Sequence, residues 1–189
     1  MFSKINEILL NGGVIAFPTD TVWGIGCLPI HKIAVERIYQ IKHREAQKPL
    51  ILMSYDVKPL LDYVKTPIPF QGENLAEKYW PGALTLIFEK SSQTPDCITS
   101  YQNTVGIRVP DHTFFQEMCK NITGNVLATT SANISGQNPA LTYEEAIKYI
   151  GDQVDFVVPY SEKISGVPSA VVSVLNDNMV VYRQGNLVF

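Results

Sequence analysis

The sequence predicts an α/β fold, in which helices flank a twisted sheet of mixed parallel and antiparallel strands. Short apolar runs typical of buried strands alternate with segments of helical periodicity along most of the chain. In the last third the predicted strands follow one another closely, which favours antiparallel pairs beside the parallel ones. The 189 residues, 46% of them hydrophobic, suffice for one core, so we expect a single domain over residues 1–189.

Four segments have the pattern of amphipathic helices. Ser3 is a suitable N-cap for the first, which Gly12-Gly13 ends, and Asp111 is a suitable N-cap for the third. Thr142 and Glu145 have the spacing of a capping box and open the fourth. The predicted helices cover residues 3–10, 32–42, a stretch after 111 that buries Phe114, Phe115 and Met118, and 142–150.

The remaining apolar runs predict strands, most of them after Pro, Gly or Asn. The predicted strands cover residues 14–17, 50–53, 83–88, 105–109, 126–129, 156–159, 170–175 and 179–182, with a hairpin turn at Asp177-Asn178.

Composition excludes several classes of protein. The net charge of −3 argues against extensive non-specific binding to nucleic acid, although a local basic groove remains compatible with it. No apolar run approaches the roughly 20 residues that span a bilayer, and the N-terminus lacks a signal peptide. We therefore expect a cytoplasmic protein. The three cysteines form no CxxC pair and the three histidines have no metal-ligand spacing, so we expect no protein metal site.

A cluster of cations follows the second predicted helix. Lys42, Arg44 and Lys48 fall within seven residues of a chain that has only 15 Lys and Arg. Such a cluster can hold phosphate groups. A solvated helix end that complements the helix dipole explains it equally well. No Walker loop and no GxGxxG motif is present, so side-chain cations would have to do the phosphate work.

Three further motifs have polar side chains at strand ends. The segment Pro18–Gly26 places hydroxyls and exposed backbone after a strand, for a small polar ligand or simply for a turn around a buried Trp23. Arg108 stands within an apolar strand and needs an anion, either a ligand carboxylate or an internal ion pair. The run Ala128–Gly136 is richer in hydroxyls and amides than a turn requires, and Arg183 follows the last strand.

No nucleophile with a neighbouring base stands out. The serines lie outside any GxSxG elbow, and no histidine is placed for a triad. The donors, acceptors and cations suit positioning and charge stabilisation of a phosphate-bearing substrate.

Five blocks in fixed order give the chain a specific resemblance. PTDTVWGIG, KHR…KPL, VGIRVP, TTSANISG and VYRQG resemble the YrdC/TsaC family, the L-threonylcarbamoyladenylate synthases, over nearly the whole chain. The resemblance implies a nucleotidyltransferase with a concave basic groove. It implies that L-threonine, bicarbonate and ATP, accompanied by Mg²⁺, give threonylcarbamoyl-adenylate and pyrophosphate. The implied partners are tRNA, which receives the N6-threonylcarbamoyladenosine modification, and the threonylcarbamoyl transferase machinery.

The resemblance also implies roles for eleven residues. Lys42 and Arg44 match the family's KxR pair at the nucleotide phosphates and are the implied catalytic cations. The other implied nucleotide contacts are Lys48, Thr104, Asn133, Thr142 and Arg183. The implied threonine contacts are Thr21, Arg108, Ser131 and Ser169, with Arg108 on the carboxylate. Met53 stands where many longer members have His, and residues 166–170 lack the Glu and Thr of the common G-x-E-S-T form.

Two alternatives to the synthase remain at this point. One is an RNA-binding module of the same fold, which the net charge of −3 disfavours. The other is a paralogue that handles a different carbamoyl-adenylate or lacks synthase activity.

Overall fold

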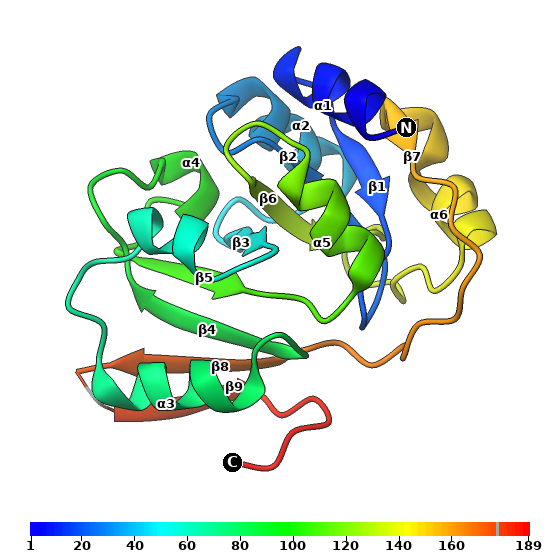
Figure 1. Ribbon diagram of the computed structural model, residues 1–189. Helices are drawn as coiled ribbons and strands as arrows, with labels where there is room; N and C mark the ends of the chain where they lie inside the picture. The colour runs from blue at the N-terminus through cyan, green and yellow to red at the C-terminus, as the bar shows by residue number, and fades with distance from the viewer. Residues whose placement is uncertain (177) are drawn as a thin grey trace.

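A nine-stranded mixed sheet forms the centre of the computed structural model, which describes residues 1–176 and 178–189. The strand order is β7-β1-β2-β6-β3-β5-β4-β8-β9. The pairs β1–β7, β3–β5 and β4–β8 are parallel and the others antiparallel, and β1 and β8 run at a large angle to each other (Figure 1). The predicted α/β fold with a twisted mixed sheet is therefore confirmed. The strands are β1 (Ile15–Phe17), β2 (Gly24–Cys27), β3 (Ile51–Ser54), β4 (Leu84–Glu89), β5 (Thr104–Arg108), β6 (Val126–Ser131), β7 (Phe156–Val157), β8 (Ala170–Leu175) and β9 (Asn178–Arg183).

Helices cover both faces of this sheet. Figure 1 shows α1 and α5 at the β1 end and α3 along the β8–β9 end. The helices are α1 (Phe2–Leu10), α2 (Lys32–Ile41), α3 (Phe70–Tyr79), α4 (Asp96–Thr99), α5 (Thr113–Lys120) and α6 (Tyr143–Ile150), with 3₁₀ turns at Lys58–Tyr63 and Gly151–Gln153. None of the helices described is long and apolar enough to cross a bilayer.

Two of the predicted helix caps are wrong by one or two residues. Ser3 lies inside α1, whose N-cap is Met1. The N-cap of α5 is His112 rather than Asp111, because the Nδ1 atom of His112 accepts a hydrogen bond from the backbone N–H of Phe115 at 3.2 Å. The Thr142 cap of α6 is confirmed. The predicted hairpin turn includes Asp177, which lies outside the described residues.

Alternate side chains of the strands enter two separate cores. One core joins the strands to α2 and α6 through residues such as Ile38 and Ile150. The other joins the opposite face to α1 and α5 through residues such as Leu9 and Phe115. In β6, Val126 and Ala128 enter the first core and Leu127 enters the second, as the two-residue period of a strand requires.

The face of the sheet that packs against α1 and α5 carries polar side chains at positions further from these two helices. The strand register places Thr85, Arg108, Thr129, Ser131 and Arg183 on the same face as Leu127. The sheet thus offers a row of polar side chains beside the second core, and this row forms the floor of the candidate site.

Candidate functional site

A cavity of about 400 Å³ lies over these polar side chains. It brings together seven of the eleven predicted residues: Thr21, Arg44, Arg108, Ser131, Asn133, Ser169 and Arg183. Arg108 is level with Leu127 in the strand register. Ser131 lies four residues further along β6, about 13 Å at the usual rise per residue. The cavity therefore has two ends with different side chains.

Arg108 forms the first end and is almost fully buried, at 2% exposure. Its Nε atom donates to the carbonyl of Gly82 at 2.9 Å, and Nη1 donates to Oγ1 of Thr21 at 2.9 Å. Its Nη2 atom forms an ion pair with Oδ1 of Asp20 at 2.6 Å. The internal ion pair, one of the two explanations of this arginine, is thus present. Burial lowers the pKa of Arg108, and Asp20 opposes this shift.

Arg183 and Ser169 lie beside this end. The Nε atom of Arg183 donates to the carbonyl of Ser169 at 2.6 Å, and Nη2 donates to its hydroxyl at 3.3 Å. That hydroxyl also shares a hydrogen bond of 3.0 Å with Thr85. Burial lowers the pKa of Arg183. No carboxylate pairs with Arg183 among the described residues, so its charge can act on a ligand.

Arg44 forms the opposite end with Ser131 and Asn133. Its Nε atom donates to the carbonyl of Lys48 at 2.9 Å, and Nη2 donates to that of Pro49 at 2.9 Å. These two backbone contacts fix the plane of the guanidinium without neutralising it. Burial lowers the pKa of Arg44, whereas Tyr39 and Glu45 oppose this shift. No ion pair to Arg44 occurs in the described chain.

Lys42 lies behind the cavity wall rather than in it. Its side chain is 1% exposed, and Nζ donates to the carbonyl of Asn133 at 2.7 Å, to Oδ1 of Asn133 at 2.8 Å and to the carbonyl of Ser131. Ser131 Oγ donates to the same Oδ1 at 2.7 Å. Three acceptors use all three donors of an ammonium. Lys42 therefore holds the Ser131–Asn133 turn in place. Burial lowers the pKa of Lys42 to about 7, and the positive charge of Arg44 contributes less to the same shift.

Three predicted nucleotide contacts lie outside the cavity. Lys48 is exposed and pairs with Glu45 at 2.9 Å. Thr104 lies at the opposite end of β5 from Arg108 and borders a separate hollow with Lys65 and Lys90. Thr142 accepts the backbone N–H of Glu145 at 3.2 Å as the α6 cap. The structure does not bring these three side chains to the other seven.

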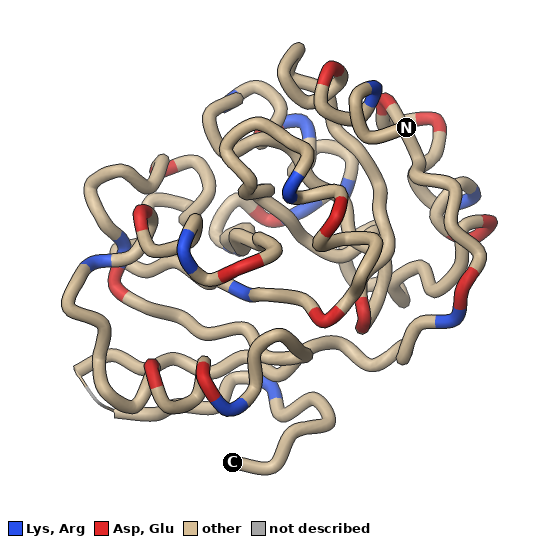
Figure 2. The backbone as a smooth tube through the Cα atoms, viewed as in Figure 1, with Lys and Arg blue, Asp and Glu red and all other residues tan. Residues whose placement is uncertain are grey.

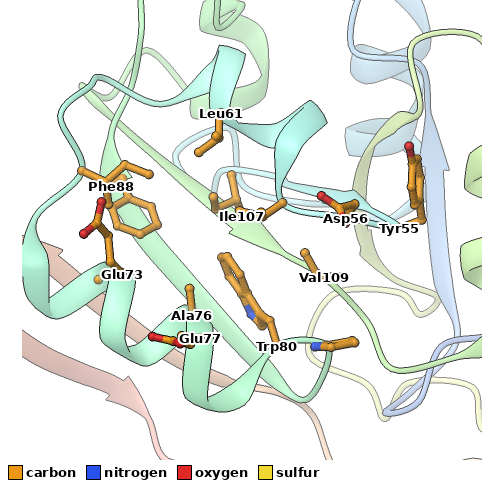
Figure 3. Close-up of a pocket in the computed structure, with 14 residues that line it drawn as sticks. Tyr55, Asp56, Leu61, Glu73, Ala76, Glu77, Trp80, Phe88, Ile107 and Val109 are labelled. Atoms are coloured by element: carbon orange, nitrogen blue, oxygen red, sulfur yellow. The ribbon is translucent and has the colours of Figure 1, made fainter.

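A larger cavity, of about 560 Å³, lies between the Lys58–Tyr63 turn and α3 (Figure 3). Trp80 projects into it towards the core residues Ile107 and Val109. Ile107 lies on the opposite face of β5 from Arg108, and Val109 directly follows this strand. Its lining includes Asp56, Glu73 and Glu77 but no Lys, Arg or His. Such a lining repels phosphates, so the smaller cavity suits an anionic substrate better.

The arginines of the smaller cavity stand out from the overall distribution of charge. Figure 2 shows Lys and Arg interspersed with Asp and Glu along the whole tube. The cavity lining, by contrast, holds Arg44, Arg108 and Arg183 and no carboxylate. Among the described residues no cluster of three His, Cys, Asp or Glu could hold a metal ion. The lining is thus suited to anions and does not fit a magnesium ion held by the protein.

The partner of Arg108 behind the cavity was missed from the sequence. Asp20 belongs to the PTDTVWGIG block, but nothing in that block identifies it as the partner of Arg108, 88 residues away. Trp23, in the same block and directly before β2, lines the cavity and packs against Tyr143 with the ring centroids 6.2 Å apart.

Comparison with known proteins agrees with this fold and cavity. The family model Sua5/YciO/YrdC, described as "Telomere recombination", matches residues 7–185. A threonylcarbamoyl-AMP synthase of Idiomarina loihiensis is 34% identical over 168 residues, which are 88% of this chain and 90% of that protein. One of Marinobacter nauticus is 33% identical over 170 residues, 89% of this chain and 88% of that protein.

Two solved structures also have the same fold as this chain. Sua5 of P. abyssi in complex with L-threonine superposes with a TM-score of 0.92 at 31% identity, and the match covers 98% of this chain and 54% of that one. The chain thus spans about half of that Sua5. E. coli YciO superposes with a TM-score of 0.88 at 27% identity, covering 98% of this chain and 89% of that one. The chain belongs to the Sua5/YciO/YrdC family.

Proposed function

We propose that this protein is a threonylcarbamoyl-AMP synthase, which converts L-threonine, bicarbonate and ATP to L-threonylcarbamoyladenylate and pyrophosphate. The observation that carries the proposal is the cavity, whose lining gathers three arginines and the Ser131–Asn133 turn without a carboxylate. Relatives named threonylcarbamoyl-AMP synthase match the chain over almost their whole length. The cavity and these relatives support the same activity.

The two ends of the cavity suit the two larger substrates. Arg108, with Thr21 and Ser169, would take the carboxylate and hydroxyl of threonine. The related Sua5 of P. abyssi has been solved in complex with L-threonine, which supports threonine as a substrate. Arg44 and Asn133, at the opposite end, would take the nucleotide. Two expected contacts lie at the other end from their partners in this division: Ser131, expected at threonine, lies beside Asn133, and Arg183, expected at the nucleotide, lies beside Ser169. Lys42 acts indirectly, because its donors are already used on the Ser131–Asn133 turn.

The chemistry needs positioning and charge stabilisation rather than a protein nucleophile. The threonine amine combines with bicarbonate to give a carbamate and water. A carbamate oxygen then attacks the α-phosphorus of ATP, and the bond to the pyrophosphate group breaks. Two anions must approach each other for this attack, so unneutralised guanidinium groups lower the barrier. Mg²⁺ enters only as the counter-ion that accompanies ATP, since the cavity lining offers no carboxylate to bind it.

Several further expectations remain proposals. Contacts of Lys48, Thr104 and Thr142 with the nucleotide would require these segments to move towards the cavity. The concave basic groove rests on the resemblance alone, and so do tRNA and the threonylcarbamoyl transferase machinery as partners. A single domain over residues 1–189 and a cytoplasmic location rest on the length, composition and N-terminal sequence of the chain.

A pyrophosphate-release assay tests the proposal. We expect release that requires ATP, L-threonine and bicarbonate together, and that Arg44→Ala abolishes. Arg37→Ala is the matched control, because Arg37 pairs with Asp155 outside the cavity. Release that does not depend on threonine would contradict the proposal. Salt-sensitive tRNA binding without any turnover would favour the RNA-binding module instead.

A further inference from the structure

The arginine proposed to bind the threonine carboxylate already has a carboxylate partner. Asp20 Oδ1 lies 2.6 Å from Nη2 of Arg108, whose side chain is 2% exposed. The arginine keeps two unused N–H groups, because Gly82, Thr21 and Asp20 account for three of its five donors. A second carboxylate can therefore bind, but it meets an ion pair of zero net charge rather than a free cation.

The other two arginines of the cavity differ from Arg108 in this respect. Arg44 and Arg183 contact neutral oxygens: carbonyls of Lys48, Pro49 and Ser169, and the hydroxyl of Ser169. Neither has a carboxylate within ion-pair distance in the described chain. The cavity thus contains two cationic groups that attract any anion and one guanidinium whose charge is cancelled.

Asp20 acts from outside the cavity. Thr19 and Thr21 line the cavity, whereas Asp20 between them does not. The loop is held by a hydrogen bond of 3.0 Å between the hydroxyls of these two threonines. Backbone bonds to the segment before β8 also hold it, Ser165 N to Asp20 O at 3.2 Å and Gly166 N to Thr21 O at 2.8 Å. Asp20 is therefore fixed behind Arg108, where it orients the guanidinium without touching a ligand.

We propose that Asp20 is a positioning and specificity residue: by pairing with Arg108 it cancels the charge of that arginine, so that the carboxylate site at Arg108 favours a zwitterion over an anion. The inference rests on the proposed function. The carboxylate of L-threonine, a zwitterion, can still accept from the two unused N–H groups of Arg108. ATP and bicarbonate are anions, and they would compete more strongly for an unpaired Arg108, which lies close to the uncompensated charge of Arg183. The pair therefore reduces the competition of the anionic substrates for the threonine carboxylate site.

Binding measurements on Asp20→Asn test this. The asparagine Oδ1 can still accept from Nη2, so the variant removes the charge and keeps the hydrogen bond. The ligands, measured by calorimetry, are L-threonine and (R)-3-hydroxybutanoate, its anionic analogue without the amino group. We expect the preference for threonine over the analogue to fall about tenfold in Asp20→Asn, because the site at Arg108 gains an uncompensated positive charge. Asp155→Asn is the control, because Asp155 forms a pair of the same length, 2.6 Å, with Arg37 outside the cavity.

The outcomes separate this inference from the proposed function. If the wild-type protein binds no threonine, the proposed function is contradicted and this inference fails with it. If it binds threonine and Asp20→Asn keeps the wild-type preference, only the role of Asp20 is wrong. Should Asp20→Asn fail to fold, Asp20→Glu keeps the charge one methylene further away. We expect that variant to bind threonine more weakly while still preferring it, and a preference for the anion would overturn the inference.

Discussion

Arg108 uses three of its five donors on Gly82, Thr21 and Asp20. An arginine between Ile107 and Val109 must find an anion, and the sequence left an internal partner and a ligand as equal alternatives. The structure supplies the internal partner, Asp20, and leaves two donors for a ligand. The internal pair therefore does not exclude a ligand carboxylate, because a guanidinium has five donors and the sequence gives no count of those already used.

Arg108→Lys should weaken threonine use specifically. The ammonium keeps the charge but cannot contact Gly82, Thr21, Asp20 and a carboxylate at once. We expect the KM for threonine to rise about 10- to 100-fold, since hydrogen bonds to charged groups contribute roughly 1.5–3 kcal/mol. Steady-state kinetics with each substrate varied in turn measure this, with Arg37→Lys as the control. An equal rise in the KM for ATP would contradict the assignment of the two ends.

Lys42 should make stability depend on pH. Its pKa is about 7 in the folded protein and 10.5 in the unfolded chain. Below about pH 7 both states carry the proton, so Lys42 has no effect on the slope. Between these values only the unfolded chain binds the proton. The free energy of unfolding should therefore rise with pH in this window, by at most about 1.4 kcal/mol per pH unit.

Lys42→Met isolates this contribution. The variant loses the titrating group, so its free energy of unfolding should rise less steeply between about pH 7 and pH 9 than that of the wild type. Urea unfolding at several pH values measures both slopes, and their difference cancels the other titrating groups. Parallel slopes would show that the three oxygen acceptors around Nζ keep the ammonium charged throughout.

At the scale of elements, the local hydrophobic pattern predicted the strongly periodic segments correctly. It failed for segments whose secondary structure depends on pairing or packing with distant parts of the chain. The capping box and apolar stripe of α6 sufficed to predict it. The segment Gly24–Cys27 has two glycines and a low strand propensity, yet it is a strand because it pairs with both β1 and β6. The helix α3 was missed because Gly72 is its one fully buried residue, which gives it little apolar periodicity.

Gly24 lets β2 pack closely against Phe17 of the second core. Its strand register places it beside Ser131, and a Cβ atom built there would lie 2.9 Å from Cε2 of Phe17. A side chain at this position would collide with the second core. A glycine that weakens the strand is therefore required by packing, which is why propensity alone mispredicted this segment.

Thr142→Ala tests whether Thr142 acts as a helix cap or as a nucleotide contact. In the structure its hydroxyl caps α6, so we expect a loss of about 1 kcal/mol in the free energy of unfolding. The KM for ATP should stay at the wild-type value. Urea denaturation and kinetics on the same preparation give both readouts. A raised KM without loss of stability would instead support the nucleotide contact that the family resemblance implies.

At the scale of the whole molecule, the order of five short blocks carried more information than any block alone. Each block was ambiguous locally, but the sheet brings parts of four of them to one cavity: Thr21, Arg108, Ser131 with Asn133, and Arg183. Arg44, which belongs to the remaining block, lines the same cavity. The sequence could not place Lys42 behind the wall, because this depends on the direction in which the turn after α2 presents its side chains.

Product identity tests the central claim most directly. Purified protein would be incubated with ATP, L-threonine and ¹³C-labelled bicarbonate, and the products analysed by mass spectrometry. The account predicts threonylcarbamoyladenylate that carries one labelled carbon, formed together with pyrophosphate and lost in Arg44→Ala. An adenylate of threonine without the labelled carbon, or no adenylate from folded protein that binds both ATP and threonine, would contradict it.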